Sequence, residues 1–86
     1  MFNNYSMSSQ NNIRTYLIGI GKAVRLFRRK KGWTQEYLSF KSRLDRTYIG
    51  GLERGERNAT IGTLLKVSNA LGISIFDLIE EAKNNV

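Results

Sequence analysis

Apolar residues recur at helical spacing near the start of this chain, three or four positions apart. The members of this stripe are Leu17, Ile20, Val24 and Phe27. Such a stripe predicts an amphipathic helix over residues 17–31 with one buried face. Gly19 and Gly21 are expected to weaken its first turn. Gly32 is suited to end the helix in the left-handed conformation.

Two further helix starts follow, only eleven positions apart. Thr34 and Asp45 are N-cap residues, and each is preceded by an apolar residue that can pack on another one inside the helix. These pairs are Trp33 with Leu38 and Leu44 with Ile49. Because only Ser42 and Arg43 are left for a turn, the two short helices must cross steeply. The segment therefore predicts a helix-turn-helix.

Two more capped segments complete the pattern. Thr60 and Ser74 are N-cap residues, and Asp77 stands in the capping-box position after Ser74. Gly72 ends the first of these two helices. The whole pattern predicts an all-α fold of five helices in one domain, residues 17–86. Residues 1–16 begin with an Asn- and Ser-rich stretch and are expected to form a flexible N-terminal tail.

The helix predicted over residues 46–54 has two different faces. Ile49 and Leu52 are three positions apart and should point into the core. The outward positions have cations at both ends and no large apolar side chain; they are Arg46, Thr47, Gly50, Gly51 and Arg54. Such a face fits a helix laid into the major groove of DNA, although an ordinary solvated surface helix has a similar composition.

The distribution of charge favours a DNA-binding helix over an ordinary solvated surface helix. The 86 residues carry a net charge of +7, but residues 14–57 hold twelve Lys or Arg against four acids, a balance of +8. Residues 58–86 hold two cations against three acids, a balance of −1. One half is therefore an anion-binding surface. Nucleic acid fits it better than a membrane, because a membrane-surface helix aligns its cations along one stripe backed by apolar residues.

The residue types that are missing exclude most enzyme chemistry. The chain has no Cys and no His, so it lacks thiol nucleophiles, thiolate ligands and the imidazole groups that serve as bases and metal ligands. Glu36, Asp45 and Asp77 fall at helix starts, where the helix dipole accounts for them. We expect no enzymatic activity, no cofactor and no metal site. Without a signal peptide at its start, the protein is expected to be cytoplasmic.

The helix-turn-helix segment carries a recognisable motif. Its positions are Thr34, Gln35, Glu36, Leu38, Leu44, Asp45, Ile49, Glu53 and Gly55. With this motif the chain resembles the phage-repressor-like (Cro and repressor type) transcription regulators over residues 18–81. The resemblance implies a compact lambda-repressor-like DNA-binding domain. Within the family, the string LDRTYIGGLERGERNATI looks most like the controller proteins of restriction-modification systems, which are small dimers.

The resemblance also implies roles for individual residues. Base reading is expected at Arg46, Thr47 and Tyr48, because Gly50 and Gly51 stand where other members often carry base-reading side chains. The residues expected to contact the DNA backbone are Gln35, Lys41, Arg43, Gly51, Arg54, Arg57 and Asn58. By the same resemblance, Arg28 and Glu53 should form a structural ion pair, with the remaining Arg28 donors available to a phosphate.

Two departures from the family pattern carry expectations of their own. Ser39 replaces a packing Ala, and its hydroxyl is expected to bond back to the carbonyl four residues earlier. Arg43 stands where the family often has Gly, and a non-glycine residue held at positive φ costs on the order of 1 kcal/mol. That cost is understandable if the guanidinium group is used.

The last helix carries more apolar surface than one core-facing stripe needs. We expect Ile73, Phe76 and Ile79 to form a two-fold dimer interface, although Phe76 could instead fold back on its own domain. The predicted partners are a double-stranded DNA operator, a second copy of the chain and RNA polymerase. Three other functions stay open: a phage or plasmid repressor, an antitoxin-like protein that binds a partner protein, and a non-specific nucleic-acid binder.

Overall fold

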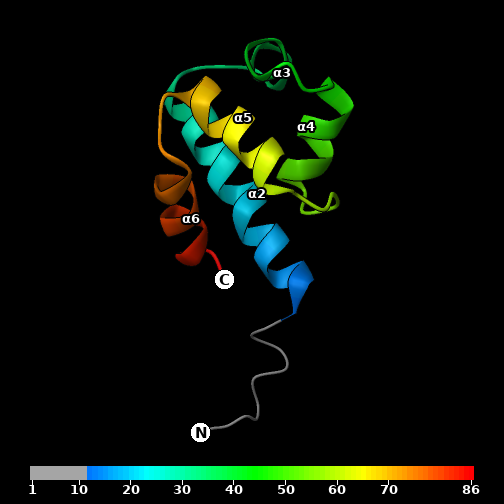
Figure 1. Ribbon diagram of the computed structural model, residues 1–86, viewed down its shortest axis with the longest axis vertical. Helices are drawn as coiled ribbons and strands as arrows, with labels where there is room; N and C mark the ends of the chain where they lie inside the picture. The colour runs from blue at the N-terminus through cyan, green and yellow to red at the C-terminus, as the bar shows by residue number, and fades with distance from the viewer. Residues whose placement is uncertain (1–11) are drawn as a thin grey trace, which may run out of the picture.

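The computed structural model describes residues 12–86, which form five α-helices and no strand. With the labels of Figure 1, these are α2 (Ile13–Lys30), α3 (Gln35–Ser42), α4 (Arg46–Glu53), α5 (Ile61–Leu71) and α6 (Ile75–Lys83). The predicted all-α, five-helix fold is confirmed. Residues 1–11 of the predicted tail lie outside the described residues.

The first helix begins earlier than predicted. Asn12 is its N-cap, and the Asn12 side-chain oxygen accepts a hydrogen bond from the Arg14 N–H at 2.7 Å. Residues 13–16, predicted as part of the tail, are therefore helical, and that boundary was wrong. Ile13 is 64% exposed, so it lies outside the apolar stripe on which the prediction rests. The asparagine cap was the signal for the true start.

The turn between α3 and α4 is closed by three hydrogen bonds. Arg43 adopts the predicted left-handed conformation, with φ of 62°, and its N–H donates to the Ser39 carbonyl. The Leu44 N–H donates to the same carbonyl at 3.3 Å, and the Ser39 hydroxyl donates to the Leu44 carbonyl at 2.6 Å. The expectation that Ser39 bonds back along α3 was wrong. Because Arg43 reverses the chain, the Leu44 carbonyl comes within reach of that hydroxyl.

The other helix starts mostly follow the predicted caps. The Thr34 hydroxyl accepts the Tyr37 N–H at 3.0 Å, and capping boxes begin α5 at Thr60 and α6 at Ser74. Asp45 occupies the N-cap position of α4, but its side chain forms no capping hydrogen bond, so this prediction was wrong. The closed turn and the packing of Leu44 on the core hold this end of α4 instead.

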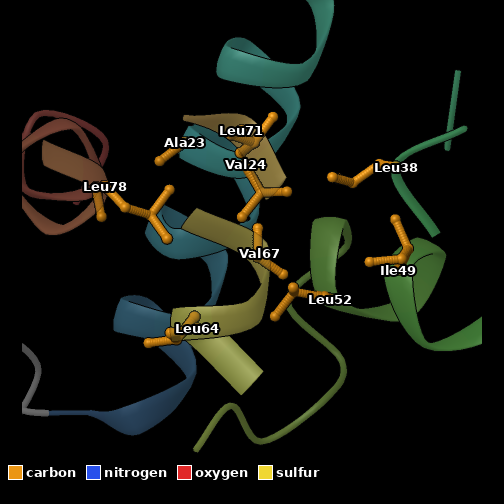
Figure 2. Close-up of a cluster of buried hydrophobic side chains, with 10 residues drawn as sticks. Ala23, Val24, Leu38, Ile49, Leu52, Leu64, Val67, Leu71 and Leu78 are labelled. Carbon is orange, nitrogen blue, oxygen red and sulfur yellow. The ribbon is translucent and has the colours of Figure 1, made fainter. Parts of the chain in front are cut away.

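The core is one buried cluster to which every described helix contributes (Figure 2). Its fully buried large side chains are Leu38 from α3, Ile49 and Leu52 from α4, Val24 from α2, Val67 and Leu71 from α5, and Leu78 from α6. Burial of each such side chain stabilises the fold by roughly 1.5 to 3 kcal/mol. Both short helices of the helix-turn-helix are therefore held by their apolar faces rather than by helix propensity.

The glycines of α2 bring it close to its neighbours. A Cβ atom on Gly21 would collide with the Leu52 and Glu53 carbonyl oxygens of α4. A Cβ atom on Gly19 would lie 2.8 Å from the Ala82 carbonyl oxygen of α6. Both residues are buried inside a regular helix rather than in a weakened first turn. Figure 1 shows α4 and α6 on opposite sides of α2, and these glycines permit both close contacts.

Candidate nucleic-acid interface

The outer face of α4 is cationic, as predicted, but its middle is covered. Arg46 and Thr47 are exposed in the first turn of the helix. Gly50 is buried, and its neighbours on this face are two guanidinium groups and the side-chain oxygen of Gln35. A Cβ atom on Gly50 would lie 3.2 Å from Nη1 of Arg54 and 3.4 Å from Nη1 of Arg46. Two cations therefore meet over one glycine, on the face that a DNA groove would receive.

Arg57 covers the other glycine of this face. Gly51 is buried, and a Cβ atom there would lie 2.8 Å from Cγ and 3.0 Å from Nε of Arg57. The Arg57 guanidinium carbon is 5.5 Å from the centre of the Tyr48 ring, which is a cation–π arrangement. In this structure the Arg57 side chain covers Gly51, and the expected contact of Gly51 with the DNA backbone stays a prediction.

Tyr48 is half-buried and packs against the core, unlike the two exposed residues before it. Its hydroxyl donates to the Asn58 carbonyl at 3.3 Å and lies 3.2 Å from the Thr63 hydroxyl. Tyr48 therefore ties α4 to the loop that follows it and to α5. For Tyr48 to read a base, its hydroxyl must exchange these partners.

Glu53 is the centre of a polar network that joins three helices. The carboxylate is buried and accepts hydrogen bonds from Nε of Arg28 at 2.6 Å and Nη2 of Arg28 at 2.9 Å. The predicted ion pair is therefore present, in a two-pronged geometry. Nη1 of Arg28 donates to the Trp33 carbonyl at 2.8 Å. Because Arg28 is only 7% exposed and bonds within the protein through Nε, Nη1 and Nη2, little of its guanidinium group is left for a phosphate, and that contact stays a prediction.

Gln35 also belongs to this network. Its side-chain amide donates to Glu53 at 2.9 Å, so the group expected to clamp a phosphate is engaged inside the protein. Arg25, which the sequence prediction missed, donates to the same carboxylate at 3.2 Å while its side chain stays 40% exposed. Its position one turn before Arg28 on α2 was the available signal. Arg25 is therefore an additional cation beside the start of α3.

The network shifts the pKa values of both members of the ion pair. Hydrogen bonding to Glu53 raises the pKa of Arg28 above its ordinary value. Burial alone would raise the pKa of the Glu53 carboxyl, but hydrogen bonds from Arg28, Gln35 and Arg25 outweigh burial and lower it. Glu53 therefore stays ionised and holds α2, α3 and α4 together.

A second group of cations lies at the far end of α3. Lys41 and Arg43 line an open hollow of about 550 Å³ together with Lys66 and Asn69 of α5. Both predicted backbone-contact residues lie here, beside a lysine from the half of the chain with no net positive charge. No ion pair within residues 12–86 involves any of these three cations. This hollow is separate from the arginines that cover α4.

The remaining predicted contact residues lie on the loop after α4 and beside it. Arg54 donates to the Glu56 carboxylate at 3.0 Å in an exposed pair, so part of its charge is neutralised. Asn58 has an exposed side chain, and its carbonyl accepts the Tyr48 hydroxyl. These residues continue the cationic surface from α4 toward the start of α5.

Comparison with known proteins agrees with this geometry. The model of a family described as helix-turn-helix matches residues 24–78, which is more than half of the chain. The chain belongs to the helix-turn-helix family of transcription regulators. It is 42% identical over 71 residues to the control protein C.BamHI from Bacillus amyloliquefaciens, covering 81% of this chain and 84% of that protein.

Two further proteins are similar to this helix-turn-helix chain. It is 41% identical over 56 residues to a hypothetical transcription factor from Neisseria meningitidis, covering 65% of this chain but only 53% of that protein. A structure of the restriction-modification controller protein C.Esp1396I, a tetramer bound to its natural 35-base-pair operator, is similar with a TM-score of 0.71 and 42% identity. That match covers 79% of this chain and 95% of that one.

The helix-turn-helix chain also carries an apolar patch on α6, far from α4 (Figure 1). Phe76 is 77% exposed and Ile79 is 43% exposed. Ile73 differs from the other two predicted interface residues, since it is half-buried and packs against the core. Beside Ile79, an apolar hollow of about 270 Å³ is lined by residues of α2 and α6 and by Val86. Phe76 does not fold back on its own domain.

No single helix within residues 12–86 is long and apolar enough to cross a membrane. Only α5 and α6 taken together reach that length and apolar character, and this pair is bent by 100°.

Proposed function

We propose that this helix-turn-helix regulator is the controller protein of a restriction-modification system. In this proposal two copies bind a pseudo-palindromic DNA operator and regulate transcription by occupying it. The observation that carries the proposal is the outer face of α4, where Arg46 and Thr47 are exposed and two guanidinium groups cover Gly50. The similarity to C.BamHI and C.Esp1396I supports the restriction-modification assignment. The protein would act in the cytoplasm, without enzymatic activity, and contact RNA polymerase when it activates.

We propose that the first turn of α4 contacts the bases and reads the DNA sequence. An arginine presents two N–H donors that match O6 and N7 of guanine, and a good pair of this kind discriminates by roughly 1 to 3 kcal/mol. We assign that role to Arg46, which is exposed in this turn with Thr47 beside it. Tyr48 would join them only when its hydroxyl leaves Asn58 and Thr63.

The proposed backbone contacts lie along α4 beyond this turn. Arg25 and the N-terminus of α3 lie beside the end of α4, where Arg25 and Gln35 donate to Glu53. Arg54, Arg57 and Asn58 follow at the end of α4 and on the loop after it. Lys41 and Arg43 would reach the backbone from their own hollow, with Lys66 beside them.

The experiment compares wild type with Arg46→Ala on operators substituted at each position in turn. We expect the mutant to lose its preference at one guanine in each half-site while keeping non-specific binding. Arg29→Ala is the matched control, since Arg29 is an exposed arginine for which no contact with α4 is seen, in a hollow that Glu81 of α6 also lines, and it should keep the base preference of wild type. If Arg46→Ala weakens binding equally on all operators, Arg46 contacts only phosphate. If wild type shows no sequence preference at all, the protein is a non-specific binder.

The restriction-modification assignment has a separate test. The neighbouring gene should encode a methyltransferase or an endonuclease, and the protein should bind DNA upstream of that operon. A toxin gene at this place, together with a second protein that co-purifies, would replace the assignment with the antitoxin-like alternative.

A further inference from the structure

Gly51 is buried on the face of α4 that points away from the core. Its neighbour in space is the side chain of Arg57, which returns from the following loop and crosses the helix at this point. A Cβ atom at position 51 would lie 2.8 Å from Cγ, 3.0 Å from Nε and 3.4 Å from Cδ of Arg57. Cγ and Cδ belong to the aliphatic stem and Nε to the guanidinium group, so a side chain at position 51 would force Arg57 to shift.

The position of Arg57 is fixed from a second side by Tyr48. The guanidinium carbon lies 5.5 Å from the centre of the Tyr48 ring. The ring is itself anchored, because its hydroxyl bonds to the Asn58 carbonyl and to Thr63. Arg57 therefore lies between the Tyr48 ring and the backbone of α4 at Gly51, which has no side chain.

The charge of Arg57 remains available in this position. Within the described part of the chain no carboxylate pairs with Arg57, whereas Arg54 pairs with Glu56 at 3.0 Å. A cation–π contact leaves the N–H donors of a guanidinium group free for an anion. Arg57 thus combines two contacts that restrict its side chain with an unneutralised charge.

We propose that Gly51 is a positioning residue for DNA binding, which acts by letting Arg57 lie across the recognition helix. Long side chains lose rotamer freedom when they bind, and a side chain already held in place loses less. Gly51 therefore increases the affinity for DNA through Arg57, and not through a close approach of its own backbone to DNA. This inference rests on the proposed contact between Arg57 and the DNA backbone.

The test is a double-mutant cycle with Gly51→Ala, Arg57→Ala and the combined variant, measured as operator Kd at several salt concentrations. We expect Arg57→Ala to weaken binding by about tenfold and to flatten the logarithmic salt slope by about one unit. Gly51→Ala should produce much of the same loss. In the Arg57→Ala background it should add almost nothing, because the residue that it positions is gone.

Each alternative has its own outcome. If Gly51→Ala costs the same with and without Arg57, the glycine acts by itself and the positioning inference is wrong. If Arg57→Ala leaves affinity and salt slope unchanged, the proposed contact of Arg57 fails, while the Arg46 test of the function still stands. Gly62→Ala is the matched glycine control, because a Cβ atom there meets only the Thr60 hydroxyl, at 3.7 Å. It should leave binding unchanged.

A measurement without DNA separates positioning from a general loss of structure. In wild type the Tyr48 ring should shift the NMR signal of the Arg57 Nε–H proton upfield, because the guanidinium carbon lies 5.5 Å from the ring centre. Gly51→Ala should abolish this shift while the signals of core methyl groups stay in place. Ordinary random-coil shifts for Arg57 in wild type would overturn the inference, whatever the stability of the variant.

Discussion

Glu53 accepts four hydrogen bonds from other side chains. Its buried carboxylate accepts hydrogen bonds from Arg28, Arg25 and Gln35, which come from two other helices. A buried charge is tolerated only when it is paired in this way. The network therefore explains why a single carboxylate can hold the helix-turn-helix against α2.

Glu53→Gln should destabilise the protein by roughly 3 kcal/mol, because Arg28 is then left buried without its counter-charge. The free energy of unfolding in urea measures this effect. Glu80→Gln is the control, since Glu80 pairs with Lys83 at 3.4 Å on the exposed face of α6 and its loss should have no measurable effect. Equal stability of wild type and Glu53→Gln would show that the ion pair of Arg28 and Glu53 orients the helices without stabilising the fold.

The same group predicts how stability depends on pH. The pKa of Glu53 is lowered in the folded protein, so its contribution is fully present above its ordinary value of 4.5. It is lost as the pH falls through the lower folded-state value. The stability difference between wild type and Glu53→Gln should therefore shrink below about pH 4.5, measured by urea unfolding across this range. A difference that stays constant down to pH 2 would contradict the assignment.

The helices are placed by close approaches of their backbones as well as by side chains. Gly21 lies where α2 meets the end of α4, and its missing side chain leaves room for the Leu52 and Glu53 carbonyl groups. That contact also sets the position from which Arg25 and Arg28 reach Glu53. The orientation of the recognition helix thus depends on a glycine outside the helix-turn-helix.

Gly21→Ala should destabilise the protein by roughly 1 to 3 kcal/mol, although alanine is the better helix former, because the methyl group forces α2 and α4 apart. Thermal unfolding followed by circular dichroism measures the change. Gly62→Ala should have the opposite sign, since its methyl group would make only an ordinary contact with the Thr60 hydroxyl, at 3.7 Å, near the start of α5. A Gly21→Ala variant as stable as wild type would mean that the two helices separate without cost.

The molecule as a whole presents different chemistry on two sides. The cations of α4 and its loop lie on one side of α2, and the exposed apolar residues of α6 lie on the other (Figure 1). A second copy can therefore pack on α6 without covering the outer face of α4. This separation is what a dimer on a two-fold symmetric operator requires.

Phe76→Glu should weaken dimerisation, and operator binding with it, because an unpaired carboxylate in an apolar interface costs several kcal/mol. Sedimentation at micromolar concentration measures the dimer. Phe40→Glu is the matched control: Phe40 is 74% exposed on α3, against 77% for Phe76 on α6, and it should leave dimerisation unchanged. A Phe76→Glu protein that remains dimeric would move the interface away from α6.

The local sequence determined the elements of this protein and the identity of its recognition helix. Apolar spacing and the caps at Thr34, Thr60 and Ser74 predicted five helices, because both signals act within a few residues. The left-handed turn at Arg43 was predicted from the resemblance, because the family often has Gly at this position. The ion pair between Arg28 and Glu53 came from resemblance to a family, since its members are 25 positions apart.

Only the tertiary structure decided how side chains from different helices share space. Gln35 and Arg25 donate hydrogen bonds to Glu53. The Tyr48 hydroxyl bonds to Thr63, and the Arg57 side chain covers Gly51. No periodicity in the sequence encodes these choices, because they depend on which groups the crossing of α2, α3, α4 and α5 brings within a few ångströms. For the same reason, glycines that look like weak points in a helix became the positions where neighbouring elements pack most closely.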